Sequence, residues 1–190
     1  MIKTKDDLKE YMNQDRIQLG IKRAHPRLFT DEIWKYEIVL RKYEYWTNNK
    51  KGILSTLCLL YYKMIWHRKS IQLGISIGPN TCGKGLSIAH INGIQINNNA
   101  RIGENLRIQE GVTVGASGGI DAPVIGNNVF LASGARIMGK VRVPDNCVIG
   151  ANAVVVKDVP ESSITVGGIP AKKISDNDSY RFVYFYKEEQ

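Results

Sequence analysis

Two hydrophobic periods divide the chain, and the change between them falls near residue 70. Up to that point apolar residues recur every three or four positions, which is typical of amphipathic helices. The first helix is expected to open with a capping box, because Thr4 is followed three residues later by Asp7. The three expected helices begin and end at Thr4 and Gly20, Thr30 and Asn49, and Ile53 and Trp66.

After residue 70 an aliphatic residue recurs every six positions. Neither a helix, which repeats near 3.6 residues, nor a strand, which repeats near 2, has this period. Sides of six residues joined by corners make a prism, in which three sides form one coil of about eighteen residues and successive coils pair in parallel. Asn and Gly gather at the expected corners, and both accept left-handed backbone conformations. The ladder consists of Ile96, Ile102, Ile108, Val114, Ile125, Leu131, Ile137, Val143, Ile149 and Val155.

Two interruptions of the ladder are expected to project as loops. Asn92-Gly93 add two residues to the spacing before Ile96, and a five-residue excursion lies within 115–124. Loops that leave a regular scaffold often carry binding and catalytic groups. A sandwich of short strands would instead place turns about every eight to twelve residues.

Composition narrows the classes of protein. The chain has 190 residues, 43% apolar and 23% charged, which suits one domain with a proper core plus a small appendage and excludes a disordered chain. The net charge of +8 favours an acidic partner such as a phosphorylated cofactor, nucleic acid or a membrane surface. Three scattered cysteines without a CxxC pair suit a reducing compartment. The start of the chain lacks the apolar core of a leader, so a cytoplasmic location is expected.

Five segments carry a family resemblance: LSIAHINGIQI (86–96), ARIGENLRIQEGVTVG (100–115), APVIGNNVFLASGARIMG (122–139), CVIGANAVVVKDVP (147–160) and GGIPAKKI (167–174). They resemble the hexapeptide acyltransferases, and more narrowly the serine acetyltransferase branch. The resemblance implies a mainly β fold, a left-handed parallel β-helix of hexapeptide repeats behind an α-helical subdomain. It divides the chain into a helical part, a β-helix acetyltransferase domain and a tail, at 1–70, 71–174 and 175–190.

The same resemblance implies the reaction and the assembly. Acetyl-CoA is the expected cosubstrate, and a hydroxyl-bearing small molecule or glycan is the expected acceptor. Members of the family work as homotrimers or dimers of trimers, with active sites between neighbouring prisms. No metal is expected, because a zinc site would need three histidines in the coils and only His90 lies there.

His90 is the first candidate catalytic residue. It matches the family histidine that deprotonates the acceptor hydroxyl, and imidazole gains and loses a proton near neutral pH. Counting one coil onward places Glu110 over the same corner, where it either orients His90 or faces solvent. Asp121, within the excursion, is the third candidate.

The chain departs from the family pattern around the acceptor. Where the family has a second histidine just before the loop proline, this chain has Ala122, preceded by Asp121. Where the family has an aspartate directly before the first histidine, it has Ala89, and a further substrate aspartate falls near Ser76. Binding the ammonium of serine needs carboxylates, so these departures favour an acceptor other than free serine.

Cofactor positions are carried over by the same motif match. Backbone amides near the thioester are expected to stabilise the oxyanion, small residues to leave room for the pantetheine arm, and a lysine to meet the adenine or its phosphate. Lys157 is a weaker basic candidate. The matched positions are Gly115 and Ala116, then Ser133 and Ala151, then Lys172.

Other chemistries fit less well. The segment 78–85 nearly spells a phosphate-binding loop, but Gly85 stands where the magnesium-binding hydroxyl belongs, and coils follow instead of a helix. Cys82 and Cys147 follow the ladder, so they are expected to be structural rather than to form an acyl-enzyme. No nucleic-acid-binding module is recognised, which leaves nucleic acid out of the expected partners.

Two segments outside the coils leave alternatives open. The third helix, 53–66, is apolar, aromatic-rich and flanked by lysines and arginines. It either covers the open end of the prism or lies in a membrane interface, and the cover is favoured because a solenoid end exposes inward residues. The aromatic tail 180–186 is expected to pack on a neighbouring surface.

Together these observations predict an acetyl-CoA-dependent O-acetyltransferase that acts on a sugar of a surface polysaccharide or its precursor, with His90 as general base. The alternative is an L-serine O-acetyltransferase of cysteine biosynthesis. Serine acetyltransferases that dock on their partner synthase end in isoleucine, whereas this chain ends in KEEQ. A non-catalytic scaffold is a third alternative, which the intact His90 and the CoA-type last coil disfavour.

Overall fold

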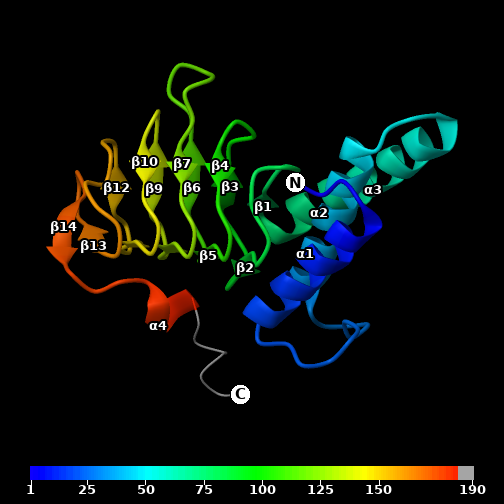
Figure 1. Cartoon of the computed structure of the whole chain (residues 1–190), viewed down its shortest axis with the longest axis horizontal. Helices are drawn as coiled ribbons and strands as arrows, with labels where there is room; N and C mark the ends of the chain where they lie inside the picture. Colours follow the sequence, from blue (N-terminus) through cyan, green and yellow to red (C-terminus); the bar gives the residue numbers. More distant parts are fainter. Residues whose placement is uncertain (184–190) are drawn as a thin grey trace.

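The helices and the coils of this chain form two adjoining parts (Figure 1). In the computed structural model, which describes residues 1–183, three helices lie against one end of a prism of short strands. A short fourth helix follows the last coil. The helices are α1 (Lys5–Gln18), α2 (Glu32–Asn48), α3 (Ile53–Leu73) and α4 (Tyr180–Val183).

Three sheets make the sides of the prism, and neighbouring strands in a sheet come from successive coils, except for the added strand β14. All pairs within them are parallel except β13 with β14. Sheet 1 contains β1 (Ile75–Ser76), β3 (Ile94–Ile96), β6 (Thr113–Gly115), β9 (Arg136–Met138) and β12 (Val154–Val155). Sheet 2 contains β4 (Arg101–Ile102), β7 (Val124–Ile125) and β10 (Arg142–Val143). Sheet 3 contains β2 (Ser87–Ile88), β5 (Arg107–Ile108), β8 (Phe130–Leu131), β11 (Val148–Ile149), β13 (Thr165–Gly167) and β14 (Lys172–Ser175).

The six-residue ladder forms the core of the prism. In sheet 3, Ile88, Ile108, Leu131 and Ile149 occupy the same register position in successive coils, and none is more than 1% exposed. Every ladder residue predicted from the sequence is buried. Aliphatic side chains at the same position of successive coils pack on one another and are removed from water. A six-residue period of aliphatic residues is therefore enough to specify this fold. The predicted left-handed β-helix is confirmed.

Asparagines stack at the corner between sheets 2 and 3. Asn105, Asn128 and Asn146 have φ values of 57°, 54° and 59°, the left-handed region that asparagine tolerates. The Nδ2 of Asn105 donates to Asn128 Oδ1, and that of Asn128 to Asn146 Oδ1, both at 2.9 Å. Gln18 of α1 donates to Asn105 at 2.9 Å, so the column also holds the first helix to the prism. Asparagine suits this column because its side-chain amide can donate one hydrogen bond and accept another at the same time.

The first three helices begin where the sequence predicts, but the third is longer than expected. The Thr4 hydroxyl accepts from the Asp7 N–H at 3.0 Å, and Asp7 Oδ2 accepts from the Thr4 N–H at 2.8 Å, which completes the capping box. α3 continues to Leu73, beyond the predicted boundary at residue 70. Gly74 then ends it with a φ of 64°.

The open end of the prism is covered mainly by α2. Tyr36 and Leu40 of α2 belong to the same buried core as Ile75 and Ile77 of the first coil, and the Tyr36 hydroxyl accepts from the Ile77 N–H at 3.2 Å. α3 lies over α2 and contributes Trp66, whose indole N–H donates to the Ile77 carbonyl at 3.0 Å. The third helix, expected to be the cover, therefore shares this role with α2: the end of α3 supplies Trp66 and Leu73, while its first half extends away from the prism.

A buried arginine joins the helices to the first coil. Arg41 of α2 is fully buried, and its guanidinium donates to Asp15 of α1 at 2.7 and 3.2 Å and to Glu44 at 3.2 Å. It also donates to the carbonyl oxygens of Cys82 and Gly83, at 2.9 and 2.6 Å. The carboxylate of Asp15 accepts two further backbone N–H groups of the coil at 2.8 Å each. One side chain thus connects two helices and the prism.

The C-terminal segment turns back over the outer face of sheet 3. Phe182 of α4 stacks on Phe130 of β8, with ring centroids 4.5 Å apart, and Val183 is buried beside them. The described part of the aromatic tail, 180–183, therefore packs on its own prism. The remainder of the predicted tail lies outside the described residues.

Candidate active site

His90 lies on the turn from β2 to β3, at the corner between sheets 3 and 1. Glu110, Ser133 and Ala151 occupy the same position in the next three coils, because each stands two residues after a paired residue of sheet 3. Successive strands of such a sheet are about 4.8 Å apart. These four residues form a line along the prism, here called the His90 column. The predicted position of Glu110 over His90 is confirmed.

Glu110 carries a negative charge beside His90. Its pKa lies below the ordinary value, first because of the Ser133 hydroxyl and then because of its own backbone N–H, with a smaller contribution from His90. Its Oε2 atom is buried and has no hydrogen-bond partner within residues 1–183. A buried carboxylate oxygen normally has a partner, and an imidazolium or imidazole N–H is a suitable one. Glu110 therefore has a carboxylate oxygen that is not used by another group among the described residues.

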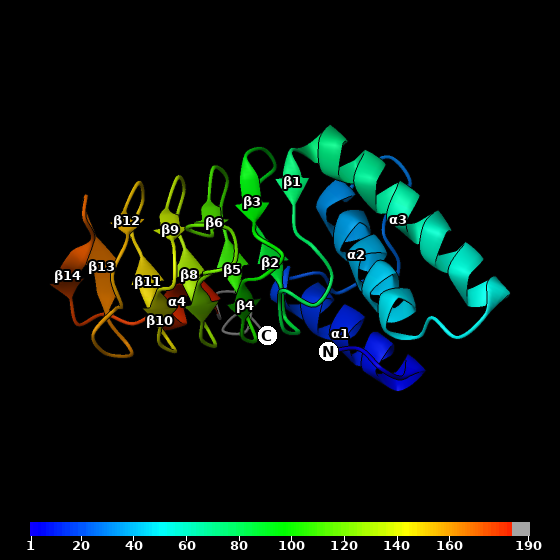
Figure 2. The same ribbon diagram turned by 90° about the horizontal axis from the view of Figure 1, so that it is seen from above.

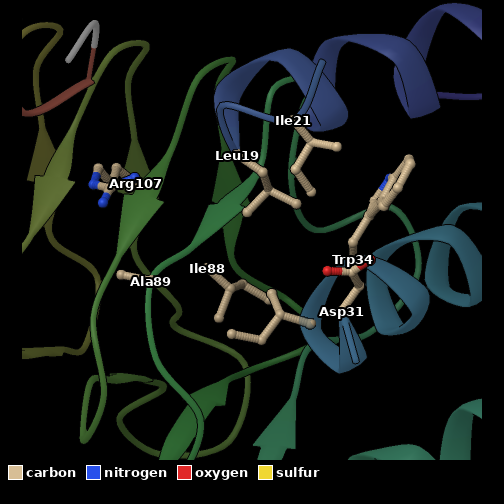
Figure 3. Close-up of a pocket in the computed structure, with 8 residues that line it drawn as sticks. Leu19, Ile21, Asp31, Trp34, Ile88, Ala89 and Arg107 are labelled. Atoms are coloured by element: carbon tan, nitrogen blue, oxygen red, sulfur yellow. The ribbon is translucent and has the colours of Figure 1, made fainter. Parts of the chain in front are cut away.

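A cavity of about 200 Å³ opens beside Ala89, the neighbour of His90 (Figure 3). Its walls come from the end of α1, the start of α2 and strands β2 and β5. Two charged residues line it among apolar ones, Asp31 and Arg107. The Arg27 N–H is the main cause of a lowered pKa at Asp31, which also pairs with Arg23 at 2.5 Å. The apolar lining is Leu19, Ile21, Ile33, Trp34, Ile88 and Ala89.

Asp31 is a residue that the sequence identified only as part of a helix start. Asp31 and Ala89 line the same cavity although they are far apart in the chain, and no spacing rule predicts this arrangement. The lining of the Ala89 cavity thus contains one carboxylate, that of Asp31, and one guanidinium, that of Arg107. His90 follows Ala89 in the chain and is not itself part of the lining.

The excursion lies at a different corner. Gly115 is the last residue of β6, so Ala116 and the rest of the loop leave the prism between sheets 1 and 2. The Ser117 N–H donates to the Asp121 carbonyl at 3.0 Å and closes the loop, which projects above the rim in Figure 1. We call this the loop corner. Six residues of extended chain, roughly 15–20 Å, separate it from Glu110.

The basic candidates also lie away from His90. Lys157 follows β12, so it lies at the loop corner two coils beyond Gly115. Lys172 begins β14 at the far end of sheet 3 and is exposed. Within one chain, the His90 column and the loop corner lie on opposite edges of sheet 1. The structure thus divides the predicted site into two halves that residues 1–183 of a single chain do not bring together.

Buried cysteines do not supply a nucleophile at either half. Cys82 and Cys147 are both buried in the coils, as predicted. Burial raises the pKa of Cys82 to about 11, so its thiol stays protonated near neutral pH. Among the residues that the structure describes, no group of three or more His, Cys, Asp or Glu side chains is arranged to hold a metal ion.

Comparison with known proteins places this arrangement in a family. Residues 122–157 match the family model described as bacterial transferase hexapeptide (six repeats). The serine acetyltransferase of Staphylococcus aureus (strain Mu50) is 35% identical over 173 residues, which cover 87% of this chain and 75% of that protein. The serine acetyltransferase of Staphylococcus epidermidis (strain RP62A) is 34% identical with the same coverage.

Solved structures give the same family. The serine acetyltransferase of Neisseria gonorrhoeae in complex with serine is 31% identical, with a TM-score of 0.67 over 90% of this chain and 70% of that one. A serine acetyltransferase in complex with CoA is 25% identical, with a TM-score of 0.68 over 89% and 68% of the two chains.

The left-handed β-helix and the matches reported above place the chain in the hexapeptide-repeat class of acyltransferases. Within that class, the chain belongs to the serine acetyltransferase family. The resemblance carried by the coil motifs is confirmed, and the chain is an enzyme rather than a bare scaffold.

Proposed function

We propose that the chain transfers the acetyl group of acetyl-CoA to a hydroxyl, with His90 as the general base. The His90 column carries the proposal, because it places an imidazole, a carboxylate and two small residues in one line. His90 takes the hydroxyl proton as the oxygen attacks the thioester carbonyl, the C–S bond breaks, and the leaving thiolate takes that proton. Glu110 is the positioning residue for His90.

The rest of the column suits a long, thin cosubstrate. Ser133 and Ala151 have short side chains, so an extended arm can lie close to the backbone along the corner. Lys172, at the last coil, would meet a phosphate at the far end of this cosubstrate. A relative in the same family has been solved with CoA, which supports acetyl-CoA as the cosubstrate. Such a reaction fits the cytoplasmic location expected from the composition.

A threefold assembly would complete the site. In a closed ring of three copies, the loop corner of one prism lies beside the His90 column of the next. Gly115 and Ala116 would then present backbone N–H groups to the oxyanion, and Asp121 would approach the acceptor. Apolar surface at both halves supports this: Ile91 beside His90 is 41% exposed and Ile120 in the loop 81%.

Mixed assemblies test whether two chains share one site. His90→Ala and a variant lacking residues 118–120 are each expected to be nearly inactive. When they are co-expressed with different tags and purified through both, every mixed ring of three copies has one site that combines an intact column with an intact loop, so about one third of the wild-type activity should return. The measurement is the turnover per site of the doubly tagged protein.

Two controls accompany that experiment. A doubly tagged preparation of His90→Ala alone should stay inactive, and doubly tagged wild type sets the full rate. A doubly tagged mixture that is no more active than either variant would show that each site belongs to one chain.

L-serine is the acceptor that the comparisons favour, rather than the sugar expected from the sequence. The relatives named above are serine acetyltransferases, and one is solved with serine. A sugar hydroxyl is the second candidate, supported by Ala89 and Ala122 at positions where the family pattern has charged or titratable residues.

Release of free CoA thiol from acetyl-CoA distinguishes the two acceptors. With L-serine we expect saturable release that His90→Ala abolishes. Release that is unchanged by serine but stimulated by hydroxyl-bearing sugars would move the assignment to the second candidate. If the wild type neither binds acetyl-CoA in calorimetry nor releases thiol with either acceptor, the proposed activity is wrong.

A further inference from the structure

α3 presents an apolar stripe to solvent. Ile53, Leu57, Leu60 and Met64 follow one another at helical spacing, and their exposed fractions are 84%, 58%, 56% and 47%. Leu54 and Tyr61 lie directly beside them and are also more than half exposed. We call these six residues the α3 stripe. Its length, eleven steps along a helix, is about 16 Å.

The stripe lies on the side of α3 that the fold does not use. The opposite side packs on α2, and Trp66 reaches the first coil. Figure 2 shows α3 along the outer edge of the helices, with its end at β1 beside the prism and its start far from it. Among the described residues 1–183, nothing covers the stripe. Its apolar character is therefore not explained by the core of one chain.

The charge around the stripe has a single sign. The sequence contains no Asp or Glu between Glu44 and Glu104. Lys50 and Lys51 precede the stripe, and the exposed Lys63 and Arg68 lie on α3 itself. A second copy of this chain laid against the stripe would bring these cations together, so self-association is disfavoured. The complementary surface is apolar and bears negative charge.

We propose that the α3 stripe seats the protein on an anionic membrane surface. The helix would lie in the plane of the interface, with its apolar side chains among the acyl chains and its lysines and arginines at the lipid phosphates. Within residues 1–183, no helix is long and apolar enough to cross a membrane. The proposal is independent of which acceptor the enzyme uses.

Sedimentation of the full chain with vesicles tests this proposal. The wild type is expected to bind vesicles of phosphatidylcholine containing about one third phosphatidylglycerol, and to bind phosphatidylcholine alone at least about tenfold more weakly. Leu57→Glu with Leu60→Glu should lower binding to the anionic vesicles by at least about tenfold, because it places charge in the apolar face. Raising the salt should also release the wild type.

A matched double variant controls for the added charge. Leu28→Glu with Phe29→Glu changes two residues that are 78% and 90% exposed in the loop before α2, far from the stripe in sequence. It should bind vesicles like the wild type, and both variants should keep wild-type thiol release with a small acceptor. Equal binding by the two variants would overturn the proposal. So would a wild type that ignores anionic vesicles, or a stripe variant whose main change is a smaller oligomer in analytical ultracentrifugation.

Discussion

His90→Ala is expected to lower kcat by about 10²–10⁴-fold, the usual contribution of a general base. The hydroxyl proton then has no acceptor at the corner where the column holds the reacting groups. The affinity for CoA should stay near that of the wild type, because the imidazole is only one end of the proposed binding line. Steady-state thiol release gives kcat, and calorimetry with CoA gives the affinity.

His25→Ala is the matched control for this loss. His25 is exposed in the loop before α2 and belongs to neither half of the site, so its replacement should leave both quantities unchanged. Turnover by His90→Ala within a factor of about three of the wild type would refute the assignment of His90 as base.

Arg41→Met is expected to lower the free energy of unfolding by about 3–5 kcal/mol. The methionine has a similar volume but leaves Asp15 and Glu44 buried without their counter-charge, and two backbone carbonyls without a donor. Urea unfolding followed by circular dichroism measures the difference. Lys9→Met is the control, because the Lys9–Asp6 pair is largely exposed and should contribute at most about 1 kcal/mol.

A small effect of Arg41→Met would have a definite meaning. If the two variants differ by less than about 1 kcal/mol, desolvation of the charges offsets their attraction in this cluster. The junction between the helices and the prism would then rest mainly on the apolar contacts of Tyr36, Leu40 and Trp66 and on hydrogen bonds such as Gln18–Asn105.

The prism could be predicted from the sequence because its hydrophobic period is short and because its corner residues need a left-handed backbone conformation. Each six-residue side puts one aliphatic residue inside, and Asn or Gly at a corner accepts a left-handed conformation. The coil count alone placed Glu110 over His90. The same count also implies that Asp121 lies at a different corner of the prism from Glu110, because strand β6 separates the two residues.

The contacts between the two parts of the chain were not predictable in this way. Glu37, Arg41 and Glu44 are charged residues of α2 that were not singled out from the sequence, yet none is more than 1% exposed. Their burial depends on how α2 meets α1 and the first coil, which no local period encodes. The Ala89 cavity is missed for the same reason, because Asp31 reaches it only after the helices have packed.

The α3 stripe shows a different limit. The sequence correctly marked 53–66 as apolar and cationic, but an apolar helix face can meet either a core or an outside surface. Only the position of α2, whose Tyr36 fills the end of the prism, decides that most of this face remains outside.

The excursion at the loop corner has a consequence for how such enzymes diverge. Although it lengthens the connection between β6 and β7, both strands keep their pairing with the neighbouring coils. Evolution can therefore lengthen, shorten or exchange the segment between Gly115 and Val124 without shifting the register of any coil. Grafting this loop from a relative onto the present chain should alter acceptor preference while the His90 column is inherited intact.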